Sequence, residues 1–171
     1  YKLDNYQNLN NSKLLFSGDS INVLKDVTHF KDYYIVSKRE MGQNRVIIVD
    51  KITGQEFRPE INADTYSLET GINTEIDSDS LRLEFDSMTI PSKTYCYLLS
   101  QHKLILLKDH KPKGLYNPED YAEKTVMVKT TNNVSIPLSI IYRKDKFKND
   151  NPCLLYAYGS YGDSEDPYFS T

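Results

Sequence analysis

The sequence predicts a mostly β protein, and three observations support this fold class. The chain contains 14 Tyr and 6 Phe, and aromatic and β-branched side chains favour the half-buried surface of a sheet. Short apolar or alternating segments follow one another at close spacing and are separated by turn residues. No segment has the convincing periodicity of an amphipathic helix. We therefore expect antiparallel sheets built from hairpins.

The first unit of this pattern lies between residues 33 and 57. The first 22 residues are polar, with one expected strand at Lys13–Phe16. Strands are expected at Tyr33–Lys38 and Arg45–Asp50, with a turn over residues 40–44 between them, and a further strand begins at Gln55–Phe57. Strand, tight turn and strand in this order are typical of an antiparallel sheet.

The same order of elements returns further along the chain. Leu81–Ser87 alternates apolar and polar positions, which places Leu81, Leu83 and Phe85 on one face. Two more strands are expected at Lys93–Leu99 and Lys103–Lys108. The second unit therefore repeats the first.

The two units are related by a constant offset. The strand that starts at Tyr33 and the one that starts at Leu81 are 48 positions apart, as are those that start at Arg45 and Lys93. Two four-stranded units at this period are typical of β-propeller blades. Because a closed propeller needs about four to eight blades, the chain is either a fragment of one or a β-sandwich with an accidental repeat.

A different composition begins at Asp109. Residues 109–120 (DHKPKGLYNPED) are rich in proline and charge and are expected to form a linker. A hairpin of Thr125–Lys129 and Ile136–Tyr142 follows, and then a charged, exposed loop over residues 143–151. The apolar run Cys153–Tyr158 predicts a buried strand that ends in the turn Gly159–Gly162, where α/β folds usually place functional loops.

Composition and motifs also bear on function. Hydrophobic residues make up 39%, the mean hydropathy is −0.59 and the net charge is −3, which gives no electrostatic basis for binding nucleic acid or an anionic membrane. No long apolar run or signal-peptide pattern is present, so we expect a cytoplasmic protein. Cys96 and Cys153 are expected to be reduced and buried. The three histidines are scattered and no P-loop motif occurs, so no metal or cofactor is expected.

Ser160 is not predicted to be a hydrolase nucleophile. The nucleophile elbow requires Gly-x-Ser-x-Gly, but Tyr158 stands two positions before Ser160. No His follows Ser160 in the chain, whereas the α/β-hydrolases order their triad as Ser, Asp and His. Tyr156 and Tyr158 share one face of the expected strand, either as rim residues of a core or as hydrogen-bond donors to a cleft.

Two stretches carry a resemblance to a known family. Residues 122–171, above all the run IPLSIIYRKDKFKNDNPCLLYAYGSYGDSEDPYFS, resemble the start of the peptidase domain of oligopeptidase B (protease II), which belongs to the prolyl oligopeptidase family of serine peptidases. Leu24–Val49 is similar to the late propeller of the same enzymes. The resemblance implies a partial β-propeller of about two blades over residues 1–110 and a hinge over 111–124. Residues 125–171 would be the first strands of a truncated α/β-hydrolase domain.

The resemblance also implies an activity. Members of this kind hydrolyse short basic peptides after Lys or Arg, and the propeller limits access by size. Tyr156 matches the family tyrosine whose hydroxyl helps to form the oxyanion hole, whereas Ala157 departs from the commoner Gly. The family's Ser, Asp and His would all lie beyond Thr171, so this chain alone is expected to be inactive.

Two further hypotheses remain open at this point. The chain could be a non-catalytic, β-propeller-type interaction module that binds a protein partner, or a second copy of itself, through open blade edges. Alternatively, a separately encoded piece could supply the triad to an assembled enzyme. A phenol at the end of a strand is needed by an enzyme but not by a binding module, so Tyr156 discriminates between these hypotheses.

Overall fold

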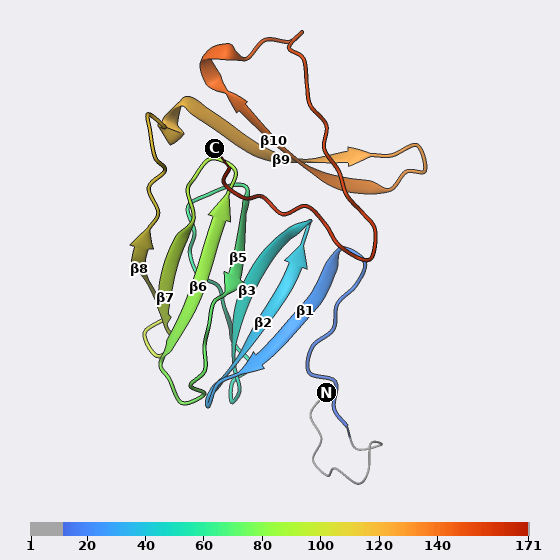
Figure 1. Ribbon diagram of the computed structural model, residues 1–171. Helices are drawn as coiled ribbons and strands as arrows, with labels where there is room; N and C mark the ends of the chain where they lie inside the picture. Colours follow the sequence, from blue (N-terminus) through green and yellow to red (C-terminus); the bar gives the residue numbers. More distant parts are fainter. Residues whose placement is uncertain (1–11, 171) are drawn as a thin grey trace.

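The computed structural model describes residues 12–170, and its ten strands form three antiparallel sheets. Two of the sheets have four strands each and stand side by side, whereas the third is a two-stranded hairpin that crosses above them (Figure 1). Two short 3-10 helices, η2 (Pro118–Asp120) and η3 (Lys144–Lys146), flank this hairpin. The predicted mostly β class is therefore confirmed.

The first sheet is a meander in the order β1-β2-β3-β4. Its strands are β1 (Asn22–His29), β2 (Tyr33–Glu40), β3 (Gln43–Asp50) and β4 (Glu56–Phe57). The two residues between β2 and β3, Met41 and Gly42, have φ values of 50° and 80°, and a type I′ hairpin turn requires positive φ at both positions. The strand expected at Lys13–Phe16 is reduced to an isolated bridge at Lys13.

The second sheet repeats this arrangement in the order β5-β6-β7-β8. Its strands are β5 (Tyr66–Thr70), β6 (Ser80–Ser87), β7 (Lys93–Leu98) and β8 (Lys103–Asp109). The strands related by the 48-residue offset, β2 with β6 and β3 with β7, occupy the second and third places in their sheets. The repeat in the sequence therefore corresponds to two four-stranded units.

The first strand of each unit, β1 or β5, was not specified from the sequence. In β1 the register with β2 shifts between Leu24 and Asp26, which interrupts the alternation of apolar and polar positions. Strand β5 spans only five residues, of which Ser67 and Leu68 are buried. Neither segment therefore carries the two-residue period that identified the other strands.

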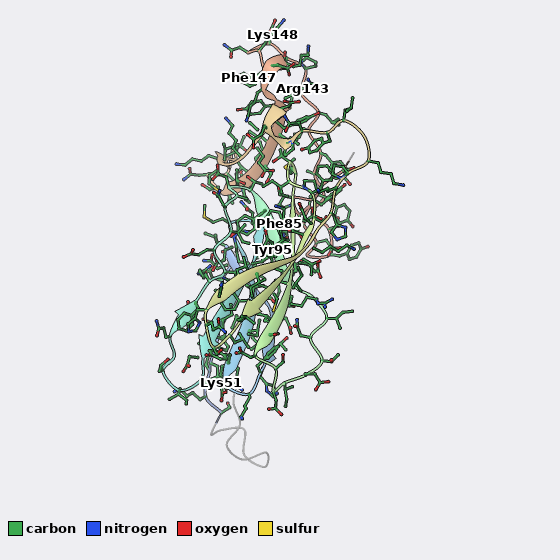
Figure 2. All side chains as sticks on the ribbon, turned by 90° about the vertical axis from the view of Figure 1, so that its left-hand side faces the viewer. Lys51, Phe85, Tyr95, Arg143, Phe147 and Lys148 are labelled. Carbon is green, nitrogen blue, oxygen red and sulfur yellow. The ribbon has the colours of Figure 1, made fainter. Side chains whose placement is uncertain are left out.

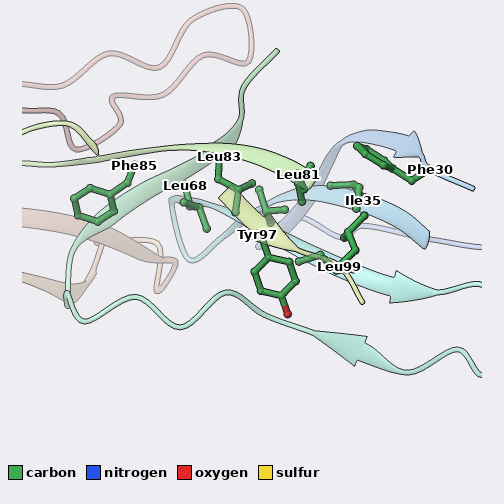
Figure 3. Packing of buried hydrophobic residues seen from close by; sticks show 10 residues of the cluster. Phe30, Ile35, Leu68, Leu81, Leu83, Phe85, Tyr97 and Leu99 are labelled. Carbon is green, nitrogen blue, oxygen red and sulfur yellow. The ribbon is translucent and has the colours of Figure 1, made fainter. Parts of the chain in front are cut away.

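One hydrophobic core lies between the two four-stranded sheets. It contains Leu81, Leu83 and Phe85, which the alternation in β6 had placed on one face. Figure 3 shows Leu81 beside Ile35 of the first sheet, with Phe85 at the other end of the same cluster. The remaining members come from both sheets: Phe30, Val46, Ile48, Leu68, Tyr97 and Leu99. Across one end of this interface the rings of Phe57 and His102 are stacked with their centroids 3.6 Å apart.

The first sheet is covered on its other face as well. Val36, Ile47 and Val49 form a second buried cluster, against which Phe16 and Tyr34 pack. Val46 to Val49 of β3 are consequently all buried, because alternate residues face two different cores. Strand β3 is therefore buried on both of its faces.

The third sheet consists of β9 (Tyr121–Lys129) and β10 (Ser135–Arg143), which pair along their whole length. Strand β9 begins at Tyr121, so it includes residues 121–124, the last part of the hinge predicted over residues 111–124. The remainder of the chain, drawn in red, returns from β10 to the upper ends of the four-stranded sheets (Figure 1). The hairpin and this returning segment are therefore both in a position to contact the two units.

The strand predicted at Cys153–Tyr158 is wrong in this structure. Residues 151–159 have no regular secondary structure, and Leu154 and Leu155 are 92% and 72% exposed. A strand is stabilised by the hydrogen bonds of a neighbour, and no strand pairs with this segment among residues 12–170. For the same reason Cys153 is exposed rather than buried, whereas Cys96 is half-buried.

No helix in the described part of the chain has the length and apolar character needed to span a bilayer.

Candidate functional site

Tyr156, the predicted catalytic residue, lies on an exposed loop. We call residues 147–165 the Tyr156 loop. It connects the 3-10 turn after β10 to the segment that returns to the four-stranded sheets. The Tyr156 side chain is 70% exposed, and that of its neighbour Tyr158 is 48% exposed. A phenol in this position can donate a hydrogen bond to a molecule that approaches the loop.

The turn predicted at Gly159–Gly162 is present but lies one residue later. The amide of Asp163 donates a hydrogen bond to the carbonyl oxygen of Ser160 at 3.0 Å. Tyr161 and Gly162, the two central residues, have φ values of 58° and 78°. Ser160 is thus the first residue of a turn, and the segment that precedes it is not a strand.

Figure 2 shows where the loop begins relative to the four-stranded sheets. Arg143, Phe147 and Lys148 lie at one end of the elongated molecule and Lys51 lies near the other, with Phe85 and Tyr95 between them (Figure 2). The Tyr156 loop therefore starts at the extremity of the hairpin sheet, far from the β3–β4 turn. Its position depends on how the hairpin and the returning segment are attached to the blades.

The hairpin is attached to the second sheet through Glu123 of β9. The Ser87 hydroxyl donates to Glu123 Oε1 at 2.8 Å, and the Thr89 amide donates to Oε2 at 3.0 Å. Ser87 is fully buried and Thr89 is 6% exposed. Hydrogen bonds of a carboxylate to buried donors are stronger than those between neutral groups, so Glu123 holds β9 firmly at the end of β6.

Thr125 attaches the same strand to both sheets. Its hydroxyl accepts a hydrogen bond from Gln43 Nε2 at 2.8 Å and lies 3.0 Å from the hydroxyl of Thr65. Gln43 begins β3, whereas Thr65 immediately precedes β5 and is fully buried. One hydroxyl of β9 therefore joins the first and second units at their junction.

An aromatic contact supports the segment that leads into β9. The ring of Tyr116 stacks on that of Tyr121 with the centroids 5.3 Å apart, and its hydroxyl donates to the carbonyl oxygen of Thr89. Burial raises the pKa of Tyr116, and the nearby Tyr121, Glu123 and Asp120 raise it further. The hydroxyl therefore stays protonated as a donor at neutral pH.

The far end of the Tyr156 loop is attached through Asp166. Arg39 of β2 donates hydrogen bonds to both carboxylate oxygens of Asp166, from Nη1 to Oδ1 at 2.5 Å and from Nη2 to Oδ2 at 2.9 Å. Asn44 Nδ2 donates to Oδ2 at 3.0 Å. The next residue, Pro167, is buried, and the amide of Phe169 donates to Asp86 Oδ1 at 2.9 Å.

Asn44 joins this attachment to the junction between the sheets. Its side chain is 2% exposed, and Nδ2 lies 3.1 Å from Ser67 Oγ and 2.6 Å from Glu69 Oε1 of β5. Lys25 of β1 donates to Asn44 Oδ1 at 3.2 Å. Among the described residues, every buried side-chain nitrogen and oxygen has a hydrogen-bond partner, so this polar cluster is fully satisfied.

The sequence analysis proposed Tyr156 as a site residue but did not predict the residues that attach its loop. Arg39, Asn44, Glu123 and Asp166 are separated by tens of positions in the chain, and their spacing gives no sign that they meet. The available signal was the polar pair Gln43–Asn44, which stands one residue before the apolar run Val46–Val49. It was interpreted as part of a turn, whereas both side chains are buried.

The described residues contain no group of three or more His, Cys, Asp or Glu side chains that could bind a metal ion. Around Tyr156 the structure instead presents a phenol on a loop fixed at both ends. Such an arrangement can supply a hydrogen bond but not, by itself, a nucleophile and a base.

Comparison with known proteins agrees with this architecture. The family model of the prolyl oligopeptidase N-terminal β-propeller domain matches residues 3–110. Among solved structures, oligopeptidase B from Trypanosoma brucei superimposes with a TM-score of 0.77 at 23% identity, over 89% of this chain and 23% of that one. Oligopeptidase B from Leishmania major has a TM-score of 0.78 at 21% identity, with the same coverage. The two sheets are therefore propeller blades, and the β-sandwich alternative is excluded.

Curated relatives extend the similarity beyond the blades. Dipeptidyl aminopeptidase BI of Pseudoxanthomonas mexicana is 31% identical over 143 residues, which cover 82% of this chain and 20% of the relative. Protease 2 of Moraxella lacunata is 22% identical over 147 residues, or 85% of this chain and 21% of the relative. The chain thus spans about a fifth of the length of these relatives. On the strength of the family model, the chain belongs to the prolyl oligopeptidase family of serine peptidases.

Proposed function

We propose that the complete protein is a serine oligopeptidase that hydrolyses short peptides after Lys or Arg. In this proposal Tyr156 donates its hydroxyl hydrogen to the oxyanion of the tetrahedral intermediate, and the propeller limits access to small or unfolded peptides. Nucleophile, base and orienting acid come from segments other than residues 1–171. This chain alone is therefore inactive.

Membership of a serine peptidase family is the observation that carries this proposal. The basic-residue specificity rests on the similarity to Protease 2 and to the oligopeptidase B structures, and on the run Tyr156–Gly162 that resembles the same enzymes. The exposure of the Tyr156 side chain is compatible with the role, because an oxyanion donor must reach the substrate. Removing one such donor lowers kcat by about 10²–10³-fold in enzymes of this type.

The test compares this chain with a longer one that continues through the downstream coding sequence. We expect the longer chain to hydrolyse a fluorogenic Arg substrate and the present chain to be inactive. Replacing Tyr156→Phe in the longer chain should lower kcat at least tenfold, because only the hydroxyl is lost. Tyr161→Phe is the matched control, since it removes a hydroxyl from the exposed turn of the same loop, whereas Tyr158 shares a face with Tyr156 and is itself a candidate donor.

Three outcomes would contradict the proposal in different ways. A well-folded longer chain without peptidase activity would favour the non-catalytic interaction module. Faster cleavage after Pro than after Arg would replace the basic specificity with that of a prolyl peptidase. Activity of residues 1–171 alone would show that the catalytic groups lie within them.

A further inference from the structure

We propose that Gln43 is a positioning residue that couples the attachment of the β9–β10 hairpin to the seam between the two blades, where the start of β5 lies beside β3. Its side chain bonds to the hairpin and to the second blade, while its backbone belongs to the first blade. We call the residues that take part the blade joint: Gln43, Arg45, Thr65, Tyr66 and Thr125. This inference is independent of the proposed function.

The partners of the Gln43 amide fix its orientation. The oxygen Oε1 accepts hydrogen bonds from Arg45 Nη2 at 2.6 Å and from the backbone amide of Tyr66 at 3.0 Å. The nitrogen Nε2 donates to the Thr125 hydroxyl at 2.8 Å. A half-turn of the amide would point its NH₂ group at two other donors, so only one orientation satisfies all three partners. Because Gln43 is only 6% exposed, a lost partner is not readily replaced by water.

The joint takes the place of a strand at the edge of the second blade. Among the described residues, β5 pairs only with β6, and an edge strand otherwise presents unpaired backbone groups. At Tyr66 the N–H bonds to Gln43, and the carbonyl oxygen accepts from Arg45 Nη1. The Arg45 guanidinium also lies over the Tyr66 ring, 3.7 Å from its centroid, which is the geometry of a cation–π contact. Side chains of the first blade therefore hold the start of β5.

Thr125 brings the hairpin into the same arrangement. Its hydroxyl oxygen accepts from Gln43, so its hydrogen is available to the hydroxyl of Thr65, 3.0 Å away. Thr65 is fully buried and directly precedes Tyr66. Of the hairpin attachments described above, this is the one in which a single side chain bonds to both blades.

The coupling follows from this chain of hydrogen bonds. Without the Thr125 hydroxyl, Gln43 Nε2 becomes a buried donor without an acceptor, which favours a turn of the amide toward another partner. Such a turn also takes Oε1 away from the Tyr66 amide. A change in the hairpin thus reaches the start of β5 through Gln43, without a direct bond from Thr125 to the backbone of Tyr66. By linkage, a change at Gln43 acts on the hairpin in return.

Hydrogen exchange in the complete protein tests the coupling at the Tyr66 amide. We expect Thr125→Val to speed exchange of this amide at least threefold, because local opening at the start of β5 becomes easier. Thr131→Val, in the exposed β9–β10 turn, is the matched control and should leave the Tyr66 amide unchanged. Tyr116→Phe removes a different bond, between the segment that leads into β9 and the second blade. It should also leave the Tyr66 amide protected.

Substitutions at Gln43 test the other direction. Gln43→Met keeps a similar length without hydrogen-bonding groups, so exchange should rise at least threefold both at Tyr66 and in β9. Gln43→Glu should retain the protection, because a carboxylate accepts from Arg45 and Tyr66 and can also accept from the Thr125 hydroxyl. In denaturant unfolding, the losses of stability in Gln43→Met and Thr125→Val should not add in the double variant, since both remove the same bond.

Three results would overturn the joint. Unchanged exchange at Tyr66 in Thr125→Val would show that Gln43 keeps its bond to β5 without the hairpin. An equal increase in Tyr116→Phe would show that loosening the hairpin by any route reaches β5. Additive losses in the double variant would show that the two side chains act independently. Neither readout uses peptidase activity, so a failure of the proposed function leaves this test intact.

Discussion

At the scale of single residues, Gly42 shows how a missing side chain joins two parts of the molecule. It closes the turn between β2 and β3 with a φ of 80°, a region that L side chains rarely adopt. A Cβ atom at Gly42 would lie only 2.5 Å from Cγ of Pro137 in β10. Glycine is therefore required here both for the turn and for the close approach of the hairpin.

We predict that Gly42→Ala lowers the free energy of unfolding more than Gly54→Ala does. Gly54 also has a positive φ, of 73°, but nothing lies within 4 Å of the added Cβ. Its replacement should cost about 1–2 kcal/mol for the backbone alone, and the clash at Gly42 should add roughly 1–3 kcal/mol. Denaturant unfolding of the two variants measures the difference.

The second part of this prediction concerns Pro137. Combining Gly42→Ala with Pro137→Ala removes the clashing ring, and the loss of stability should fall toward that of Gly54→Ala. If Gly42→Ala and Gly54→Ala lowered the free energy of unfolding equally, the hairpin would move away from the added methyl group without loss of stability. The contact with Pro137 would then be unimportant.

At the scale of elements, the hairpin of β9 and β10 is held mainly by polar contacts. Its attachments use Glu123 and Thr125, and each bonds to side chains that are buried at the ends of the blades. Buried polar groups destabilise a protein when a partner is removed and contribute only modestly when satisfied. The hairpin is thus placed with a defined geometry rather than by a large apolar surface.

We predict that Thr125→Val destabilises the protein by about 1–3 kcal/mol. Valine has a similar shape, but it leaves the buried Gln43 amide and the Thr65 hydroxyl without the partner that they share. Thr131→Val, in the exposed β9–β10 turn, is the control and should change little. Thermal unfolding monitored by circular dichroism compares the variants, and equal midpoints would show that Gln43 and Thr65 find other partners.

Elements differ in how well the sequence predicts them. Strands β2, β3, β6 and β7 were predicted because alternating or continuous apolar residues reflect which faces they bury. The run Cys153–Tyr158 has the same character but lacks a pairing strand in the described structure. Its exposure shows that composition alone does not make a strand.

The residues of the candidate site also differ in how well the sequence predicts them. Tyr156 was predicted as a site residue because a short motif resembles a family, and its role stays a prediction. The contact between Arg39 and Asp166 was not predicted, because these residues are 127 positions apart and meet only through the fold. Hydrophobic periodicity carries no information about such long-range polar pairs.

At the scale of the whole molecule, the two blades share one core but leave the outer strand uncovered. Ile105, Leu106 and Leu107 of β8 are 37%, 48% and 53% exposed, which places three consecutive apolar side chains at an open edge. Lys103 and Lys108 flank them. Open apolar edges favour pairing with another chain, whereas flanking lysines oppose it.

We predict that the isolated chain associates through this edge and that Leu106→Lys weakens its association at least tenfold. A charge in the middle of the run must be desolvated in any strand-to-strand contact. Sedimentation velocity at several concentrations measures the effect. Val134→Lys adds the same charge at an exposed apolar position of the β9–β10 turn, so an equal effect of both variants would point to net charge instead.

The long separation between Arg39 and Asp166 also sets an order of events during biosynthesis. At about 5–20 residues per second, Asp166 follows Arg39 out of the ribosome after roughly 6–25 s. Hairpins close within microseconds, so the blades can fold while the guanidinium of Arg39 still faces water. Docking of the Tyr156 loop is therefore a late step, carried out on a surface that has already formed.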